Sequence, residues 1–342
     1  MKLSIITINY NNTEGLRKTL ASVASQTYPH IEHIIVDGGS TDESVDVIRE
    51  YESSLALSPH RLIASRLKWI SEKDTGIYNA MNKGLEIALG RRDVREDHTS
   101  APLASSPHCL IASNEYIQIL NSGDILAAPD VTERMMAALE AQQVKGERLE
   151  AKGEENGKAD TLASTPYTLH STPTEASSPY QNRPAIFYGN MTKVNTSGQV
   201  VGKSGYTEYS LRQFYNSTLN HDCAYIRADL FEQYGLYDEN LKIVSDWKWY
   251  LQAIGLGRVK PEYVDIDVTN FDDGGISETN LELRNKERRQ VLEELLPPAV
   301  LWDYDTHAFE MEQMKRLRRW KLYPIVYFME RVCFKFEKWF GL

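Results

Sequence analysis

The sequence is poor in cysteine and has no long apolar run, and each shortage excludes a class of protein. Its three cysteines lie far apart and form no CxxC pair, which disfavours a disulfide framework or a structural zinc site and fits a reducing compartment. No uninterrupted apolar run reaches the roughly 18 residues of a membrane-spanning helix. The first apolar run meets Asn9 too early for a secretory leader. We therefore expect a globular, cytoplasmic chain.

The charge of the chain is negative overall but is unevenly distributed. The 342 residues are 42% apolar and 25% charged, with a formal net charge of −10. Segment 311–342 carries eight lysines or arginines against three glutamates, so the rest of the chain is more acidic still. An acidic body disfavours nucleic-acid binding. The length predicts two domains or one elaborated α/β domain.

Short apolar runs alternate with polar turns and helical periodicity. Residues 3–8, 33–36, 67–70 and 116–120 read as buried strands, and the first three are each followed by apolar residues at helical spacing, the first helix being capped by Thr13. This alternation predicts an α/β fold with a Rossmann-like, mostly parallel central sheet and flanking helices. Later strands are expected at 186–188, 199–203, 223–226 and 263–268. Later helices are expected at 211–215, 229–234, 246–254, 282–295 and 316–340, the last interrupted at Pro324.

Three stretches interrupt this alternation. Segments 53–66, 91–114 and 141–182 are rich in Ser, Pro, Thr and small residues, and the first two contain near-copies of one Ser-Pro-His motif. We interpret them as loop insertions outside the chemistry, which makes their histidines, His98 among them, weak metal ligands. Chance similarity of Ser-Pro loops is the alternative. The expected domains are 1–280 and a helical segment 281–342.

Polar side chains follow the ends of the predicted strands, where ligands collect in open α/β sheets. Asp37 follows one strand and precedes two glycines, and Asp124 closes the turn that begins at Asn121 after another. A carboxylate there can accept a hydrogen bond from a nucleotide or hold a divalent cation on a diphosphate. An ordinary turn role is the alternative for each. The sequence has no G-x-G-x-x-G motif, which disfavours a dinucleotide site.

A second group of candidates lies later in the chain. Asp246 begins a predicted helix, where it is either a general base or a partner of the helix dipole. His221 is by default a structural histidine. Trp247 is either a platform for a sugar ring or a core residue. No Ser-His-Asp order or zinc spacing supports hydrolase chemistry.

Taken together, five segments resemble family-2 glycosyltransferases of the GT-A fold, in particular the WcaA-like type that builds bacterial surface polysaccharides. They occur in the order typical of that family, at residues 4–12, 34–42, 71–84, 120–124 and 221–247. The resemblance implies transfer of a sugar from a nucleotide-diphosphate sugar, with UDP the commonest nucleotide, to the hydroxyl of a glycan or lipid-linked acceptor, with inversion.

The resemblance also assigns roles to individual residues. Nucleotide contacts fall on Thr7, Asn9, Tyr10, Asp37 and Asp74. Asp246 becomes the catalytic base, and Asp124 the ligand of an Mg²⁺ or Mn²⁺ ion. The donor or acceptor sugar is lined by Asn121, His221, Trp247, Gly274 and Gly275.

The metal motif departs from the family pattern, because its first acid is Ser122 in this chain. Two other classes of protein therefore stay open: a degenerate transferase that binds nucleotide sugars without turnover, and a nucleotidyltransferase. The second is disfavoured because residues 7–12 contain no glycine or cation to hold phosphates.

The C-terminal segment 311–342 mixes its basic residues with aromatic ones. Such a segment can lie on an anionic membrane, here the inner face of the plasma membrane. A packed helix pair with a solvated basic face is the alternative.

Overall fold

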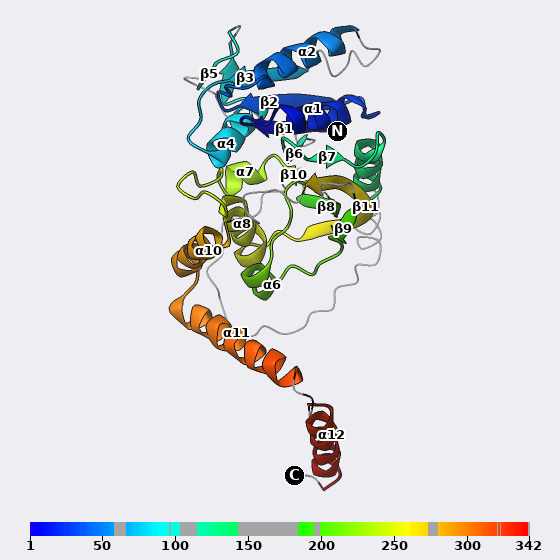
Figure 1. Ribbon diagram of the computed structural model, residues 1–342, viewed down its shortest axis with the longest axis vertical. Helices are drawn as coiled ribbons and strands as arrows, with labels where there is room; N and C mark the ends of the chain where they lie inside the picture. Colours follow the sequence, from blue (N-terminus) through cyan, green and yellow to red (C-terminus); the bar gives the residue numbers. More distant parts are fainter. Residues whose placement is uncertain are drawn as a thin grey trace, which may run out of the picture. The chain divides into compact units, whose positions relative to one another are not determined.

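The computed structural model describes residues 1–57, 66–95, 97–102, 115–142, 184–194, 199–272, 280–319, 321 and 323–340. Two compact units divide the chain, Met1–Arg284 and Asn285–Leu342. The first unit contains a nine-stranded sheet with the path β3-β2-β1-β6-β10-β8-β11-β7, and β9 pairs with β8 (Figure 1). The α/β fold class predicted from the sequence is confirmed.

The first half of the sheet is parallel throughout, as predicted. Its strands are β1 (Lys2–Asn9), β2 (Ile31–Asp37), β3 (Leu67–Ser71) and β6 (Glu115–Asn121). The helices between them are α1 (Thr13–Ala24), α2 (Ser44–Leu57) and α4 (Ile77–Ala88). Helix α1 is capped by the side chain of Asn12, which accepts from the Gly15 N–H, and not by Thr13 as predicted.

Helices cover both faces of this half because its strands are apolar on both sides. Leu3 and Ile5 of β1 belong to one core cluster with residues of α1 and α2. Ile6 alternates to the opposite face, where α4 packs so closely that a side chain on Gly84 would collide with it. The layering leaves the carboxyl ends of β1, β2 and β6 together at one edge.

The second half of the sheet is mixed, which the sequence did not predict. Strand β10 (Ala224–Arg227) runs antiparallel to both β6 and β8 (Ile186–Val194). Strand β11 (Pro261–Asp272) is parallel to β8 and antiparallel to the short β7 (Ile125–Leu126). Because β10 is reversed, the residues that precede it lie at the edge where β6 ends. This reversal brings His221 beside Asn121. The remaining strand is β9 (Val200–Lys203).

The helices of the second half are short. They are α6 (Leu211–Asn216), α7 (Leu230–Gln233) and α8 (Ser245–Tyr250), and α8 continues into the π-helix η1 (Leu251–Leu256). The sequence predicted one α-helix over 246–254. Asp246 occupies the first turn of α8, at the end that favours negative charge.

The described parts of the three interrupting segments contain more regular structure than predicted. Residues 53–57 complete α2, and residues 92–102 include the paired strands β4 (Arg92–Val94) and β5 (Ser100–Pro102). A helix over 131–142 enters the third segment. The strands form because the hairpin packs on β3, where the His98 ring stacks on Trp69 with centroids 3.6 Å apart.

Among its described residues, the second unit contains helices joined by short turns and no strand. Helix α10 (Leu281–Leu295) begins in the first unit, and α11 (Pro298–Arg318) and α12 (Tyr323–Phe340) follow it. The predicted break near Pro324 is present, and this proline lies in the first turn of α12. Most of α11 was not predicted. Across the described helices, none is both long enough and apolar enough to cross a bilayer.

Candidate active site

A cavity of about 630 Å³ opens at the edge where β1, β2 and β6 end. Its wall comes from the ends of β1 and β6, the turn after β2, the start of α4 and the segment before α8. The lining residues are Ile8, Asn9, Tyr10, Gly38, Gly39, Lys73, Asp74, Thr75, Gly76, Ile77, Ala80, Asn121, Ser122 and Lys242. The cavity is large enough for a small organic ligand.

Asp37 supports this wall through its hydrogen bond with Asn9, which lines the cavity. Its carboxylate is fully buried and accepts four hydrogen bonds, from the Asn9 amide at 2.8 Å, the Ser71 hydroxyl at 2.7 Å, and the backbone N–H and hydroxyl of Ser40. These donors are neutral and occupy both oxygens. The predicted contact between Asp37 and a nucleotide base stays a prediction, and it requires one of these hydroxyls to turn away.

Asp74 forms the opposite wall because Gly38 leaves room for it. A side chain on Gly38 would collide with the Asp74 carboxylate. That carboxylate accepts a hydrogen bond from the Gly76 N–H at 3.1 Å. Burial, together with the charge of Asp37, raises the pKa of Asp74. Asp74 is therefore protonated more easily than an exposed carboxyl group, and its protonated form can donate a hydrogen bond to a carbonyl or amide oxygen of a ligand.

Asp124 lies just behind the cavity wall. Its carboxylate accepts from the backbone N–H of Asn121 at 2.7 Å, and Asn121 itself lines the cavity. Burial, and then the nearby Asp222, raises the pKa of Asp124 to about 7. Both causes disfavour the ionised carboxylate, so a cation brought to this turn would stabilise it.

His221 and Asp246 form an ion pair next to this turn. The Nδ1 atom of His221 lies 3.4 Å from an oxygen of Asp246, and its Nε2 atom lies 3.2 Å from the Asn121 amide. Burial acts to lower the pKa of His221, but Asp246, Asp222 and Asp124 outweigh it and raise this pKa to about 9. The imidazole is therefore a cation at neutral pH.

Asp246 is correspondingly an anion. Burial acts to raise its pKa, but the His221 contact and the Tyr78 hydroxyl, which donates to Asp246 at 2.8 Å, outweigh it. The net effect places the pKa of Asp246 below its ordinary value. Its side chain remains 15% exposed, so an acceptor hydroxyl can approach it.

The predicted acids thus converge on one edge of the sheet. Asn9 pairs with Asp37 across β1 and β2, and Ile8 pairs with Asn121 across β1 and β6. Asn121 then contacts His221, which contacts Asp246. Asn9, Tyr10, Asp74 and Asn121 line the cavity, and their contacts with a nucleotide or sugar stay a prediction.

Two predicted site residues lie in the core. Thr7 is fully buried, with its hydroxyl 2.9 Å from Nε2 of His33, and it is not among the residues that line the cavity. Trp247 is 1% exposed and donates its indole N–H to the Phe214 carbonyl. It is a packing residue and offers no face to a sugar.

Gly274 and Gly275 lie outside the described residues. Sequence reasoning assigned no role to Tyr78, Asp222 or Lys242. Tyr78 lies within segment 71–84 of the family resemblance, and Lys242 lies four residues before Asp246. Their positions in these segments are the signal by which the sequence could have identified them.

The donor set for a divalent cation is small. No group of three or more His, Cys, Asp or Glu side chains suited to a metal ion occurs within the described ranges. Asp124 is the acid of the turn 121–124, and a cation bound there would lower its raised pKa. These residues fit an ion that keeps waters and takes its other ligands from a bound diphosphate, as Mg²⁺ commonly does.

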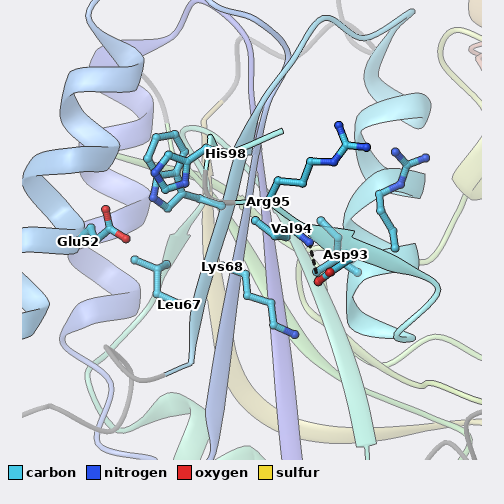
Figure 2. A pocket seen from close by; sticks show the side chains of 10 residues that line it. Glu52, Leu67, Lys68, Asp93, Val94, Arg95 and His98 are labelled. Atoms are coloured by element: carbon cyan, nitrogen blue, oxygen red, sulfur yellow. Dashed lines mark hydrogen bonds between the residues drawn. The ribbon is translucent and has the colours of Figure 1, made fainter. Parts of the chain in front are cut away.

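A second cavity, of about 290 Å³, lies at the β3 edge of the sheet (Figure 2). Figure 2 shows Glu52 on one side and Lys68 and Arg95 on the other, with His98 at the top. Lys68 is engaged with Glu32 at 2.9 Å. No predicted site residue lines this cavity.

A comparison with protein-family models matches the N-terminal part of the chain. Residues 4–92 match the family described as "Glycosyl transferase family 2". This segment supplies β1, β2, β3 and the start of α4, and with them most of the cavity wall.

Individual relatives match part of the chain. An uncharacterized glycosyltransferase of Mycobacterium tuberculosis is 32% identical over 138 residues, which is 40% of this chain and 39% of that protein. A PGL/p-HBAD biosynthesis glycosyltransferase of Mycobacterium bovis is 39% identical over 87 residues, 25% of this chain and 31% of the relative. The matches thus span well under half the length of these relatives.

A comparison with solved structures shows a similar fold over most of the chain. The crystal structure of Staphylococcus aureus TarS residues 1–349 with UDP superposes with a TM-score of 0.51 at 17% identity, covering 87% of this chain and 68% of that one. The class is an α/β fold of the GT-A type. Within this fold, residues 4–92 are similar to the glycosyltransferase family 2 model, which covers about a quarter of the chain.

Proposed function

We propose that this chain transfers a sugar from a nucleotide-diphosphate sugar to an acceptor hydroxyl, with inversion. The observation that carries the proposal is the convergence of a ligand-sized cavity with an ionised, partly exposed carboxylate, Asp246, whose charge is held by a fixed cation, His221. A UDP-sugar is the proposed donor, and a surface-polysaccharide intermediate of the kind built by WcaA-like enzymes the proposed acceptor.

The nucleotide fits the part of the cavity formed after β1 and β2. Tyr10 is 62% exposed and can stack on a base. Asp74, with its raised pKa, and Asn9, which donates to Asp37, line the same cavity. In this arrangement Asp37 supports the base site through Asn9.

The diphosphate then lies toward Asn121 and Ser122. Asp124 would hold a divalent cation there, and a bound cation neutralises the charge that develops on the leaving diphosphate. Lys242, which also lines the cavity, adds a positive charge of the protein's own.

The reaction proposed is a single displacement. The acceptor oxygen attacks the anomeric carbon while the bond from that carbon to the phosphate oxygen breaks, and its electron pair stays on the nucleotide diphosphate. The acceptor's proton passes to Asp246. A low pKa suits this role, because the carboxylate is ionised at neutral pH and the attacking hydroxyl becomes strongly acidic as the new bond forms.

A donor panel tests this function directly. Purified chain is incubated with UDP-, GDP- and dTDP-sugars, with and without Mn²⁺, and nucleotide release is followed over time. The proposal expects release from at least one donor, accelerated by a glycan or lipid-linked acceptor. Binding of a nucleotide without any release would instead identify a nucleotide-sugar-binding protein.

A membrane surface is the partner proposed for segment 311–342. On α12, Ile325, Phe328, Met329 and Val332 follow the spacing of one helix face, and the first three are well exposed. The last turn of α11 carries Lys315, Arg316 and Arg318. An exposed apolar stripe close in sequence to basic residues is typical of helices that lie in anionic interfaces.

Vesicle pelleting tests this partner. The chain should sediment with phosphatidylglycerol vesicles and remain in solution with phosphatidylcholine vesicles. Removal of residues 311–342 should abolish sedimentation while donor binding persists. Equal sedimentation with both lipids, or none with either, would contradict the proposal.

A further inference from the structure

Helix α4 joins the donor cavity to the segment that carries the base. Its first turn contributes Ile77 to the cavity wall, and the glycine before it, Gly76, has a φ of 144°, a backbone conformation that side chains other than glycine's rarely adopt. Tyr78, which follows Ile77, is not among the residues that line the cavity. It is 4% exposed, and its hydroxyl donates to Asp246 at 2.8 Å across 168 residues of sequence.

The same helix holds the approach to α8 at two further points. The Asn82 amide donates to the Tyr237 carbonyl and to Glu239, each at 2.9 Å, and accepts from the Tyr237 N–H at 3.0 Å. Asn79 donates to Glu239 at 2.8 Å. Segment 237–239 is thereby fixed on α4 a few residues before Asp246.

We propose that Tyr78 is a positioning residue, which sets the orientation of the Asp246 carboxylate relative to the donor cavity. The carboxylate is held at both oxygens, by the Tyr78 hydroxyl at one and by His221 at the other. With one contact on each oxygen, rotation of the carboxylate is restricted. The inference rests on the proposed function of Asp246 as the base.

Tyr78 takes no part in the proton transfer itself. Burial, and then the charge of Asp246, raises the pKa of its phenol well above the ordinary value, so the hydroxyl keeps its proton and remains a donor. The titratable groups that face Asp246 are Tyr78 on α4, His221 before β10, Tyr237 before α8 and Tyr250 on α8. Among them, Tyr78 and His221 make the side-chain hydrogen bonds that lower its pKa.

Tyr237 offers a matched control. Its ring contacts that of Tyr78, with centroids 5.8 Å apart, and it is as deeply buried. Within the described structure its hydroxyl has no hydrogen-bond partner. Tyr237→Phe thus removes a buried phenol oxygen from the same neighbourhood without touching the carboxylate.

The experiment compares Tyr78→Phe, Tyr237→Phe and the unaltered chain in the donor panel. Tyr78→Phe should lower kcat roughly 10- to 100-fold, because a carboxylate held at only one oxygen is less often oriented toward the acceptor. KM for the donor and Kd for the free nucleotide diphosphate should stay within about twofold. The acid limb of its kcat profile should move to higher pH, because the ionised form of Asp246 loses a donor.

Each outcome separates the two claims. Tyr237→Phe should match the unaltered chain in kcat and in pH profile. Equal kcat for Tyr78→Phe and the unaltered chain, or an equal loss in both variants, would overturn the positioning role while leaving the transferase function standing. Absence of nucleotide release from the unaltered chain would overturn the proposed function itself.

Discussion

The two halves of the sheet hold their carboxylates by different means. In the parallel half, Asp37 is saturated by neutral amide and hydroxyl donors and is fully buried. Where the mixed half begins, Asp246 is held by a histidine cation and a phenol and keeps a partly exposed face. Saturation by neutral donors suits a carboxylate that shapes a loop, whereas an ion pair with an open face suits one that exchanges a proton.

Asp124 stands between these two cases. It has one backbone donor at 2.7 Å and a pKa raised to about 7 by burial and by Asp222. Its charge is stabilised less than that of Asp37, which accepts four hydrogen bonds, and less than that of Asp246, which pairs with His221. Under the proposed function, the three acids at this edge would have three distinct roles: loop architecture, cation binding and proton transfer.

The largest effect is expected at Asp246. Asp246→Asn should lower transfer by about 10³-fold, within the range typical of removing a general base. Donor binding, followed by calorimetry, should be nearly unchanged because Asp246 is absent from the residues that line the cavity. Unchanged turnover in this variant would remove Asp246 from the mechanism and with it the contrast to Asp37.

The next largest effect concerns the cation. Asp124→Ala should lower the rate of nucleotide release on the order of 10²-fold, comparable with loss of one strong stabilising contact to the leaving group. An excess of chelator should reduce the unaltered chain to a similar rate. Ser122→Asp, which completes the two-acid motif, should raise the affinity for Mn²⁺. Full activity in chelator would contradict this role for Asp124.

A smaller effect is expected in the pH dependence of stability. The pKa of His221 is raised from 6.5 to about 9 in the folded chain. Its stabilising contribution is therefore complete below pH 6.5 and is lost as the pH rises through 9. The Tm difference between the unaltered chain and His221→Gln should shrink over this interval in thermal melts. A difference that stays constant from pH 6 to 10 would show that His221 is neutral in the fold.

The smallest effect on chemistry is expected at Asp37. Asp37→Asn presents an amide group to buried donors, and each donor left unpaired costs about 1–3 kcal/mol of stability. Urea unfolding measures this loss, with the exposed Asp46→Asn as the control. Turnover per folded molecule should change less than in any variant above. A loss of turnover as large as that of Asp246→Asn, at full stability, would make Asp37 reactive.

The parallel half could be predicted from the sequence because its signals are local. Buried strands read as continuous apolar runs, and each ends at a polar turn. The boundaries of β1, β2, β3 and β6 accordingly fall within two residues of the predicted ones. The carboxyl ends of parallel strands meet at one edge, which is why the turns after β2 and β6 could be expected at the same edge in advance.

The mixed half could not be predicted in the same way, because strand direction there depends on pairing across long stretches of sequence. The position of His221 beside Asn121 follows from the reversal of β10, which no local pattern encodes. The role of Tyr78 depends on a contact with a residue 168 positions away. The sequence around Trp247 could not show whether this tryptophan is buried or exposed, because a short helix has too few residues for a clear apolar face.

The stereochemistry of the product tests the central claim most directly, that one carboxylate acts as a base on the acceptor and not as a nucleophile on the sugar. The anomeric configuration of the product, read from the proton coupling in its NMR spectrum, should be opposite to that of the donor sugar. A product that retains the donor's configuration would require a covalent or front-face route and would contradict the assignment of Asp246.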